Sequence, residues 1–265
     1  MSTATSHPHP TTAGIRRTHD GALATIELDL PQAKNSFRAE NAQALAAALN
    51  AAVNEGARAV VLRGAGPVFC AGWDVGAIDP RADDPMAVIG EVVGPLLRQL
   101  RALPVPTLAA VSGPALGFGF GLALSCDIVL AAEDAVFGSP FRHLGMVPDS
   151  GTHHILLSRL GHGLASELIF TGRLLPGREA AALRLINRAL PGDQLIEQAA
   201  RLARDIANGP TRAFALSKQV LLQGGGFDES LELEARQLQR VFATADLREG
   251  IAAFQQRRKP VFIGR

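Results

Sequence analysis

The carboxyl group of Asp149 is the candidate catalytic group of this sequence. It lies in GMVPDSG (residues 145–151), between a proline and a Ser-Gly pair, directly before a helix-like run, THHILLSRLG. A positioned carboxylate can move protons as a general acid or base. An aspartate just before a helix can equally cap it by accepting hydrogen bonds from the first N–H groups. From these residues alone, capping is the favoured interpretation.

Two glycine-rich stretches could present backbone N–H groups to a ligand, because glycine allows close approach of the main chain. They are GAGPVFCAGWDVGAI (residues 64–78) and SGPALGFGFGLALSCD (residues 112–127). The second opens into an apolar helix, whose N-terminus would stabilise an oxyanion. Neither stretch ends in the Gly-Lys-Ser/Thr of a Walker loop, and G-x-G-x-G is not the dinucleotide fingerprint. The structural alternatives are a turn with Trp73 as a core aromatic and close helix-to-sheet packing.

The surrounding pattern predicts the elements that must position these stretches. THDGALATIELD indicates a hairpin at Asp20-Gly21, residues 37–56 an amphipathic helix and residues 57–64 a buried strand. The order then recurs, which predicts crossover connections and a mostly parallel sheet. Beyond about Gly163 the pattern predicts helices only. The recurring elements are a helix over Pro85–Arg101, a strand in PTLAAVSG, a short helix after GFGFG and a strand in CDIVLAAED.

The composition narrows the class of protein. The chain has 265 residues, 47% of them hydrophobic, and a net charge of +1, so we expect a substantial core and no general attraction to nucleic acid or membrane. Cys70 and Cys126 both lie in apolar stretches, which favours a reducing, cytoplasmic location. No stretch has the roughly 18 apolar residues of a membrane span. Residues 1–14 are predicted to be a disordered tail, and we expect no metal at His7 and His9.

Three segments together resemble the crotonase superfamily, the enoyl-CoA hydratases and isomerases. They are AVVLRGAGPVFCAGWDV, the segment from PTLAAVSG to MVPDSG, and RRKPVFIG. The resemblance covers roughly residues 15–265. It implies an α/β fold, the crotonase (ClpP-like) spiral of ββα units with a helical C-terminal region. Residues 15–205 would then form the acyl-CoA-binding core, and residues 206–265 a helical region that makes homotrimers, often paired into hexamers.

The resemblance also implies an active site. The substrate would be an acyl-CoA thioester, with no separate cofactor, and the N–H groups of Trp73 and Phe118 would form an oxyanion hole. Phe254 and Arg257 would reach the ligand of a neighbouring subunit, although residues 257–259 could also be a solvated helix end. The implied CoA- and substrate-binding residues are Lys34, Ala71, Gly72, Asp74, Val75, Gly117, Phe141, Phe254 and Arg257.

The positions of the catalytic carboxyl groups distinguish the hydratases of this family from its isomerases. At the positions of the two glutamates of family hydratases this chain has Gly121 and Phe141, which cannot transfer a proton, so efficient hydration is not expected. Asp149 matches the single acid of the family isomerases, including the epoxyphenylacetyl-CoA isomerases. The resemblance therefore favours a 1,3-proton shift through a dienolate, with Asp149 as the proton shuttle.

Other functions remain open. A hydratase of low activity, an acyl-CoA hydrolase or dehalogenase with an aspartate nucleophile, and a non-catalytic acyl-CoA binder are the alternatives. The dehalogenases also need a histidine between the glycine-rich stretches, and none occurs between His19 and His143. An RNA-binding role has little support, because lysine occurs only at positions 34, 218 and 259.

Overall fold

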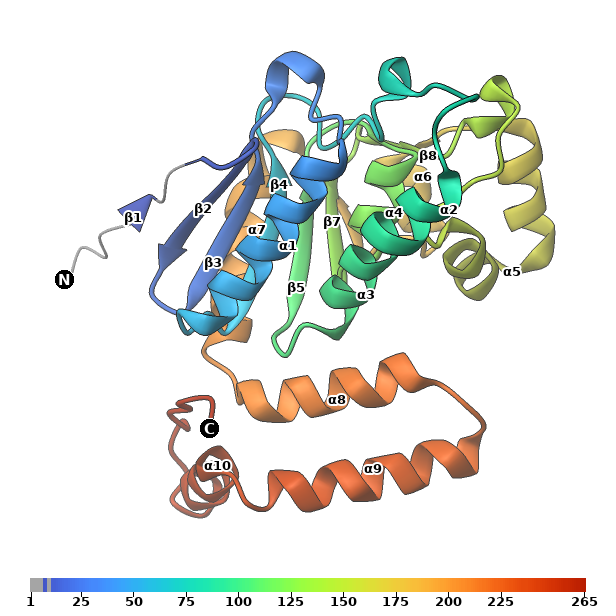
Figure 1. Cartoon of the computed structure of the whole chain (residues 1–265). Coiled ribbons are helices and arrows are strands. Elements are labelled where there is room, and N and C mark those ends of the chain that lie inside the picture. The colour runs from blue at the N-terminus through green and yellow to red at the C-terminus, as the bar shows by residue number, and fades with distance from the viewer. Residues whose placement is uncertain (1–6, 9–10) are drawn as a thin grey trace.

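A seven-stranded sheet forms the centre of the molecule in the computed structural model, which describes residues 7–8 and 11–265 (Figure 1). The first three strands are antiparallel and the remaining pairs are parallel, which confirms the mostly parallel sheet. In spatial order the strands are β1 (His7–Pro8), β2 (Ile15–Asp20), β3 (Leu23–Leu28), β4 (Ala59–Gly64), β5 (Thr107–Val111), β7 (Ile128–Ala132) and β10 (Arg188–Leu190).

The predicted hairpin is confirmed as β2 and β3. Asp20 pairs with Leu23, so Gly21 and Ala22 form the two-residue turn, and Gly21 has the positive φ (60°) that such turns require. Most of the tail predicted at residues 1–14 lies outside the described residues. In the described part of this segment, β1 pairs with β2, and Thr12 forms a bridge with Ile15.

Helices cover both faces of the sheet. The predicted amphipathic helix is α1 (Ala39–Asn54), which lies with α3 (Gly94–Ala102) on one face, and α7 (Gly192–Ala207) lies on the other (Figure 1). Each buries an apolar stripe at three- to four-residue spacing, as an amphipathic helix requires. In α7 this stripe is Leu195, Ala199 and Ala203.

A second, three-stranded sheet lies beside the first, and two of its strands belong to the segments that follow β5 and β7. Its strands are β6 (Ala115–Leu116), β8 (Val136–Gly138) and β9 (Leu175–Pro176). The helices around it are α4 (Phe118–Leu124), η4 (Phe141–Leu144), α5 (Thr152–Thr171) and α6 (Gly177–Ala182). The short helix predicted after GFGFG therefore begins inside that motif.

The prediction that no strand follows Gly163 is wrong, because β9 and β10 both do. Strands of two and three residues are too short to show an alternating pattern between long helices. β10 is nevertheless part of the main sheet, since Arg188–Leu190 pairs in parallel with Leu130–Ala132.

The predicted Pro85–Arg101 helix consists of three consecutive pieces. They are α2 (Pro85–Ala87), a π-helical segment η3 (Val88–Val93) and α3. Two short 3-10 helices, η1 (Pro31–Ala33) and η2 (Val75–Ala77), lie in the loops after β3 and β4. Among residues 7–8 and 11–265, no helix combines the length and the apolar character needed to cross a membrane.

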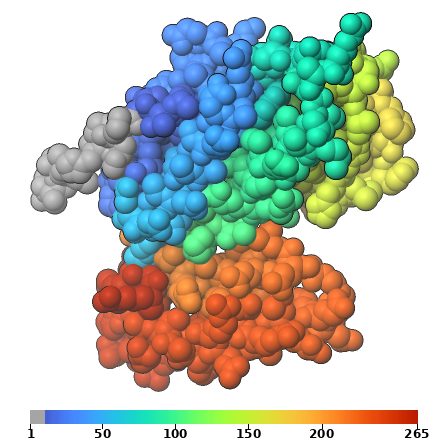
Figure 2. Space-filling view, viewed as in Figure 1, coloured from blue at the N-terminus to red at the C-terminus, as the bar shows by residue number. Residues whose placement is uncertain are grey.

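The last three helices form a layer below the core, at the end opposite the loops that follow β4 (Figures 1 and 2). They are α8 (Thr211–Gln223), α9 (Phe227–Val241) and α10 (Ala245–Gln255). Two polar anchors join them to the core. Lys218 pairs with Asp127 at 2.7 Å, and Arg58 donates to Thr211 Oγ1 at 2.8 Å and to the Phe262 carbonyl at 3.0 Å.

Candidate active site

Trp73 lies in a short stretch of parallel pairing between the loop after β3 and the loop after β4. The Phe37 N–H donates to the Gly72 carbonyl at 2.9 Å, and the Asp74 N–H donates to the Phe37 carbonyl at 2.8 Å. Because successive peptide groups of an extended chain point to opposite sides, the Trp73 N–H faces away from Phe37. Among the described residues it donates to no protein acceptor.

The second glycine-rich stretch packs directly against the first. The Leu116 N–H donates to the Cys70 carbonyl at 3.0 Å, and a Cβ at Gly72 would lie 3.0 Å from the Leu116 oxygen and 3.7 Å from the Phe118 nitrogen. Phe118 is the first residue of α4, so its N–H has no intrahelical acceptor and, within the described chain, no other. The fold thus brings together the two N–H groups expected to bind an oxyanion.

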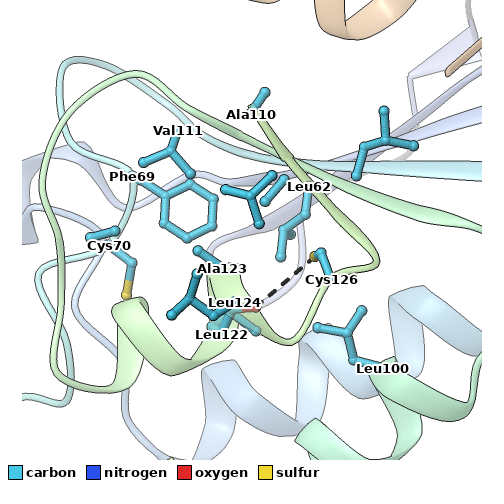
Figure 3. Close-up of a cluster of buried hydrophobic side chains, with 14 of the residues drawn as sticks. Leu62, Phe69, Cys70, Leu100, Ala110, Val111, Leu122, Ala123, Leu124 and Cys126 are labelled. Atoms are coloured by element: carbon cyan, nitrogen blue, oxygen red, sulfur yellow. Dashed lines mark hydrogen bonds between the residues drawn. The ribbon is translucent and has the colours of Figure 1, made fainter. Parts of the chain in front are cut away.

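Aromatic side chains pack against one another where the two glycine-rich stretches meet. The Phe118 ring, which is 1% exposed, lies 5.0 Å from the Phe37 ring centroid and 5.8 Å from that of Trp73. Phe118 therefore turns its side chain into the interior, while Trp73 is half-buried. Nearby, Cys70 belongs to the buried cluster of Figure 3, and burial raises the pKa of its thiol to about 12. Such a thiol is not a nucleophile at neutral pH.

The carboxylate of Asp149 does not cap a helix, so the capping interpretation is wrong. Helix α5 begins at Thr152, its cap residue is Gly151, and no side chain caps it. Ser150 and Gly151 both have positive φ (56° and 76°), and this double turn separates Asp149 from the helix start. The Asp149 main-chain carbonyl accepts from the Thr152 N–H at 3.0 Å, while its carboxylate Oδ1 accepts from the Ser150 hydroxyl at 2.7 Å.

Burial raises the pKa of Asp149, and hydrogen bonds from the Ser150 hydroxyl and from its own N–H oppose this shift. No charged side chain forms an ion pair with it among the described residues. A half-buried carboxyl without an ion pair suits proton transfer, because its raised pKa makes it a stronger base than an exposed aspartate.

Other groups fill the space around both positions expected to carry hydratase glutamates. A Cβ at Gly121 would lie 2.4 Å from the Ser150 carbonyl oxygen, and the Phe141 ring lies 3.1 Å from the Cβ position of Gly117. Gly121 is three residues, about 4.5 Å of helix axis, beyond Phe118. The Asp149 turn therefore packs within about one helical turn of the Phe118 N–H.

The implied CoA-binding residues fall into two groups. Lys34 and Ala71 lie at the site, where the Ala71 N–H donates to the Lys34 carbonyl at 3.0 Å and the Lys34 side chain is exposed. Asp74 pairs with Arg38 at 2.6 Å and accepts from the Gly76 N–H at 3.1 Å, and Val75 is exposed beside it.

Phe254 and Arg257 lie instead at the far end of the chain. Phe254 is 85% exposed on α10, and Arg257 is exposed just after it, both in the layer below the core (Figure 1). One subunit therefore does not bring them to its own Asp149.

Asn35 and Ser150 are two site-building residues that the sequence analysis missed. The fully buried Asn35 side chain accepts from the Leu30 N–H at 2.8 Å and donates to the Val68 carbonyl at 2.7 Å, so it joins the loop after β3 to the loop after β4. Its backbone is left-handed (φ 53°), a conformation that asparagine tolerates, and nothing in the sequence reveals the hydrogen bonds of its side chain. Among the described residues, no three His, Cys, Asp or Glu side chains form a metal-binding cluster.

The chain is similar to known proteins over nearly its whole length, and this similarity shows its family. Residues 18–265 match the family model described as enoyl-CoA hydratase/isomerase. The crystal structure of an enoyl-CoA hydratase from Bacillus anthracis superposes with a TM-score of 0.88 at 30% identity, covering 95% of this chain and all of the other. The chain belongs to the enoyl-CoA hydratase/isomerase family and has the crotonase fold.

Two curated relatives differ in the reaction that their names give. A protein of Rhodobacter capsulatus described as a probable enoyl-CoA hydratase is 37% identical over 253 residues, which is 95% of this chain and 98% of the relative. The 1,2-epoxyphenylacetyl-CoA isomerase of Escherichia coli is 36% identical over 251 residues, 92% of this chain and 95% of the relative. The protein is thus an enzyme of a family that contains both hydratases and isomerases.

Proposed function

We propose that this protein isomerises an unsaturated acyl-CoA by a 1,3-proton shift. The proposal rests mainly on Asp149, whose half-buried carboxyl caps no helix and, among the described residues, pairs with no cation. Its neighbour Ser150 contacts helix α4, which begins with the Phe118 N–H. At the two positions where a hydratase would need glutamates, the chain has Gly121 and Phe141, and neither side chain can transfer a proton. The similarity to an epoxyphenylacetyl-CoA isomerase supports the same choice.

In the proposed reaction the thioester oxygen accepts hydrogen bonds from the N–H groups of Trp73 and Phe118. Asp149 removes a proton from C2 of a 3-enoyl thioester, and the electrons delocalise into a dienolate whose oxygen these donors stabilise. The protonated Asp149 then returns the proton to C4, which gives the 2-enoyl product. One oxyanion-hole donor contributes about 3 kcal/mol of transition-state stabilisation.

A panel of 2-enoyl, 3-enoyl and aromatic acyl-CoAs tests this choice of reaction. We expect 3-enoyl substrates to be converted to 2-enoyl products, and water to add to crotonyl-CoA far more slowly than in ordinary hydratases, since hydration needs an activated water and a second proton donor. Rapid loss of the enoyl absorbance of crotonyl-CoA would contradict the proposal. Release of free CoA or halide would indicate the aspartate-nucleophile reaction, and binding without turnover the non-catalytic alternative.

The proposal includes a trimer or hexamer of this chain in the cytoplasm, in which Phe254 and Arg257 reach the CoA bound to a neighbour. In the layer below the core, Phe254 lines an apolar hollow with Leu247, Ile251 and Phe262. Many other large apolar side chains of this layer are exposed in the single chain, which supports burial against sister subunits. They are Leu221, Phe227, Leu231, Leu238, Phe242, Val261 and Ile263.

A further inference from the structure

We infer that Ser150 is a positioning residue for Asp149: its hydroxyl holds carboxylate Oδ1, so that Oδ2 is left to exchange the proton with the acyl group. The inference rests on the proposed isomerase function. Its geometric basis is the 2.7 Å hydrogen bond that the Ser150 hydroxyl donates to Oδ1. A carboxylate fixed through one oxygen has one orientation, and proton transfer depends on such alignment.

The backbone at Ser150 supports a role for its side chain. Ser150 has a positive φ (56°) and is only 5% exposed, a conformation that glycine would adopt without steric cost. The next residue, Gly151, also has a positive φ, so the turn already contains one glycine. A strained residue held by its surroundings is typical of functional sites. At Ser150 the side chain retained despite this strain is the one bonded to Asp149.

Helix α4 fixes the position of Ser150. The Cβ position of Gly121 lies 2.4 Å from the Ser150 carbonyl oxygen and 2.5 Å from the Ser150 Cβ, so helix and turn are in direct contact. Ser150 therefore contacts the helix that begins with the Phe118 N–H through its carbonyl oxygen and Cβ, and holds Asp149 through its hydroxyl. This contact couples the orientation of the acid to the oxyanion donor.

Few other groups can tune Asp149. The ionisable residues nearest in sequence are Arg142 and His143 on η4 and His153 and His154 on α5, all exposed, and α4 has none. Among the described residues none of them pairs with the carboxylate. The Ser150 hydroxyl is consequently the side chain that opposes the effect of burial and keeps Asp149 in its basic form at lower pH.

The decisive experiment compares the pH dependence of kcat and kcat/KM in the full-length protein and three variants. Ser150→Ala and Ser150→Gly both remove the hydroxyl, but only glycine relieves the positive φ. Thr152→Val is the matched control, because the Thr152 hydroxyl is also buried, lies two residues away and has no hydrogen-bond partner in the part of the chain that the structure describes. We expect both Ser150 variants to lose about tenfold in kcat and to move the acidic limb of the profile to higher pH, whereas Thr152→Val keeps the wild-type profile.

Two results would overturn the inference: unchanged profiles in both Ser150 variants, or a loss of activity that follows melting temperature and leaves the acidic limb in place. A ¹³C NMR titration of the Asp149 carboxyl, assigned with Asp149→Asn, needs no turnover. It should show a higher pKa in Ser150→Ala than in wild type. If the wild type isomerises no acyl-CoA while this pKa still rises, the proposed function fails and the hydrogen-bonding role of Ser150 stands. If the wild type is active and the pKa does not move, the positioning role fails alone.

Discussion

In the proposed reaction the carboxyl of Asp149 is the base, and its burial lowers the stability of the fold at neutral pH. Its carboxyl is held in a half-buried turn by one hydroxyl, and burial raises its pKa. A carboxyl whose pKa is higher in the folded than in the unfolded state stabilises the fold below its unfolded pKa. That contribution is lost as pH rises through the folded pKa.

The linkage predicts a pH-dependent effect of Asp149→Asn on stability. Asparagine is neutral at every pH and can still accept the Ser150 hydrogen bond, so the variant should melt at a higher temperature than wild type at pH 7. Below the ordinary aspartate pKa of 3.8 the difference should disappear, because both side chains are then neutral. Thermal melts of both proteins at several pH values check this. A variant that is less stable than wild type at pH 7 would show that Asp149 has an unrecognised stabilising partner.

At the scale of elements, the site depends on how closely α4 approaches the neighbouring loops. Gly119 packs on the Cys70 carbonyl and Gly121 on Ser150, each with its Cβ position less than 2.5 Å from a main-chain oxygen. Contacts this short leave no room for any side chain, because the facing atoms are backbone. The glycines of GFGFG are thus needed for the helix to reach the site.

Gly121→Ala should therefore impair catalysis. The added methyl group must push away the Ser150 backbone, and with it Asp149, so we expect at least a tenfold loss of isomerase activity and lower stability. Gly121→Glu should fail to create a hydratase for the same reason. Gly163→Ala is the control, since this exposed glycine in α5 has nothing within 4 Å of its Cβ position. Steady-state rates near wild type in Gly121→Ala would mean that the turn adapts without moving Asp149.

Some of these elements could be predicted from the sequence, and others could not. Long periodic segments such as α1 and α7 were predicted correctly, because their buried stripes repeat over several turns. Strands β9 and β10 were missed, since their pairing partners are distant in sequence and their own residues carry no pattern. The cap proposed for Asp149 failed because the left-handed conformation of Ser150 could not be read from residue types. The positions of Trp73 and Phe118 came from the family resemblance rather than from local chemistry.

At the scale of the whole molecule, the apolar layer of α8, α9 and α10 lies at the opposite end from the site loops (Figures 1 and 2). Lys218 and Arg58 hold this layer to the core through buried or part-buried polar contacts. Its outer face exposes large apolar side chains that a lone subunit would leave in water. In the trimer or hexamer that we propose, these side chains are buried and Phe254 reaches the site of a neighbouring subunit.

Sedimentation should accordingly report a trimer or a multiple of it. Phe254→Glu should weaken this assembly and raise KM for acyl-CoA, because a charge would replace an apolar side chain at the interface. In an isolated chain the same substitution would be harmless, since this side chain is 85% exposed. A wild-type protein that stays monomeric at micromolar concentration contradicts the assembly.

The most direct test of Asp149 as the catalytic base is the turnover of Asp149→Asn on an active 3-enoyl-CoA. The substitution keeps the size of the side chain and the hydrogen bond from Ser150 but removes the base. We expect a fall in kcat of roughly 10²–10⁴-fold with the fold and acyl-CoA binding retained. Near-normal isomerisation by this variant would show that Asp149 is not the base, and the proton would then have to be moved by another group.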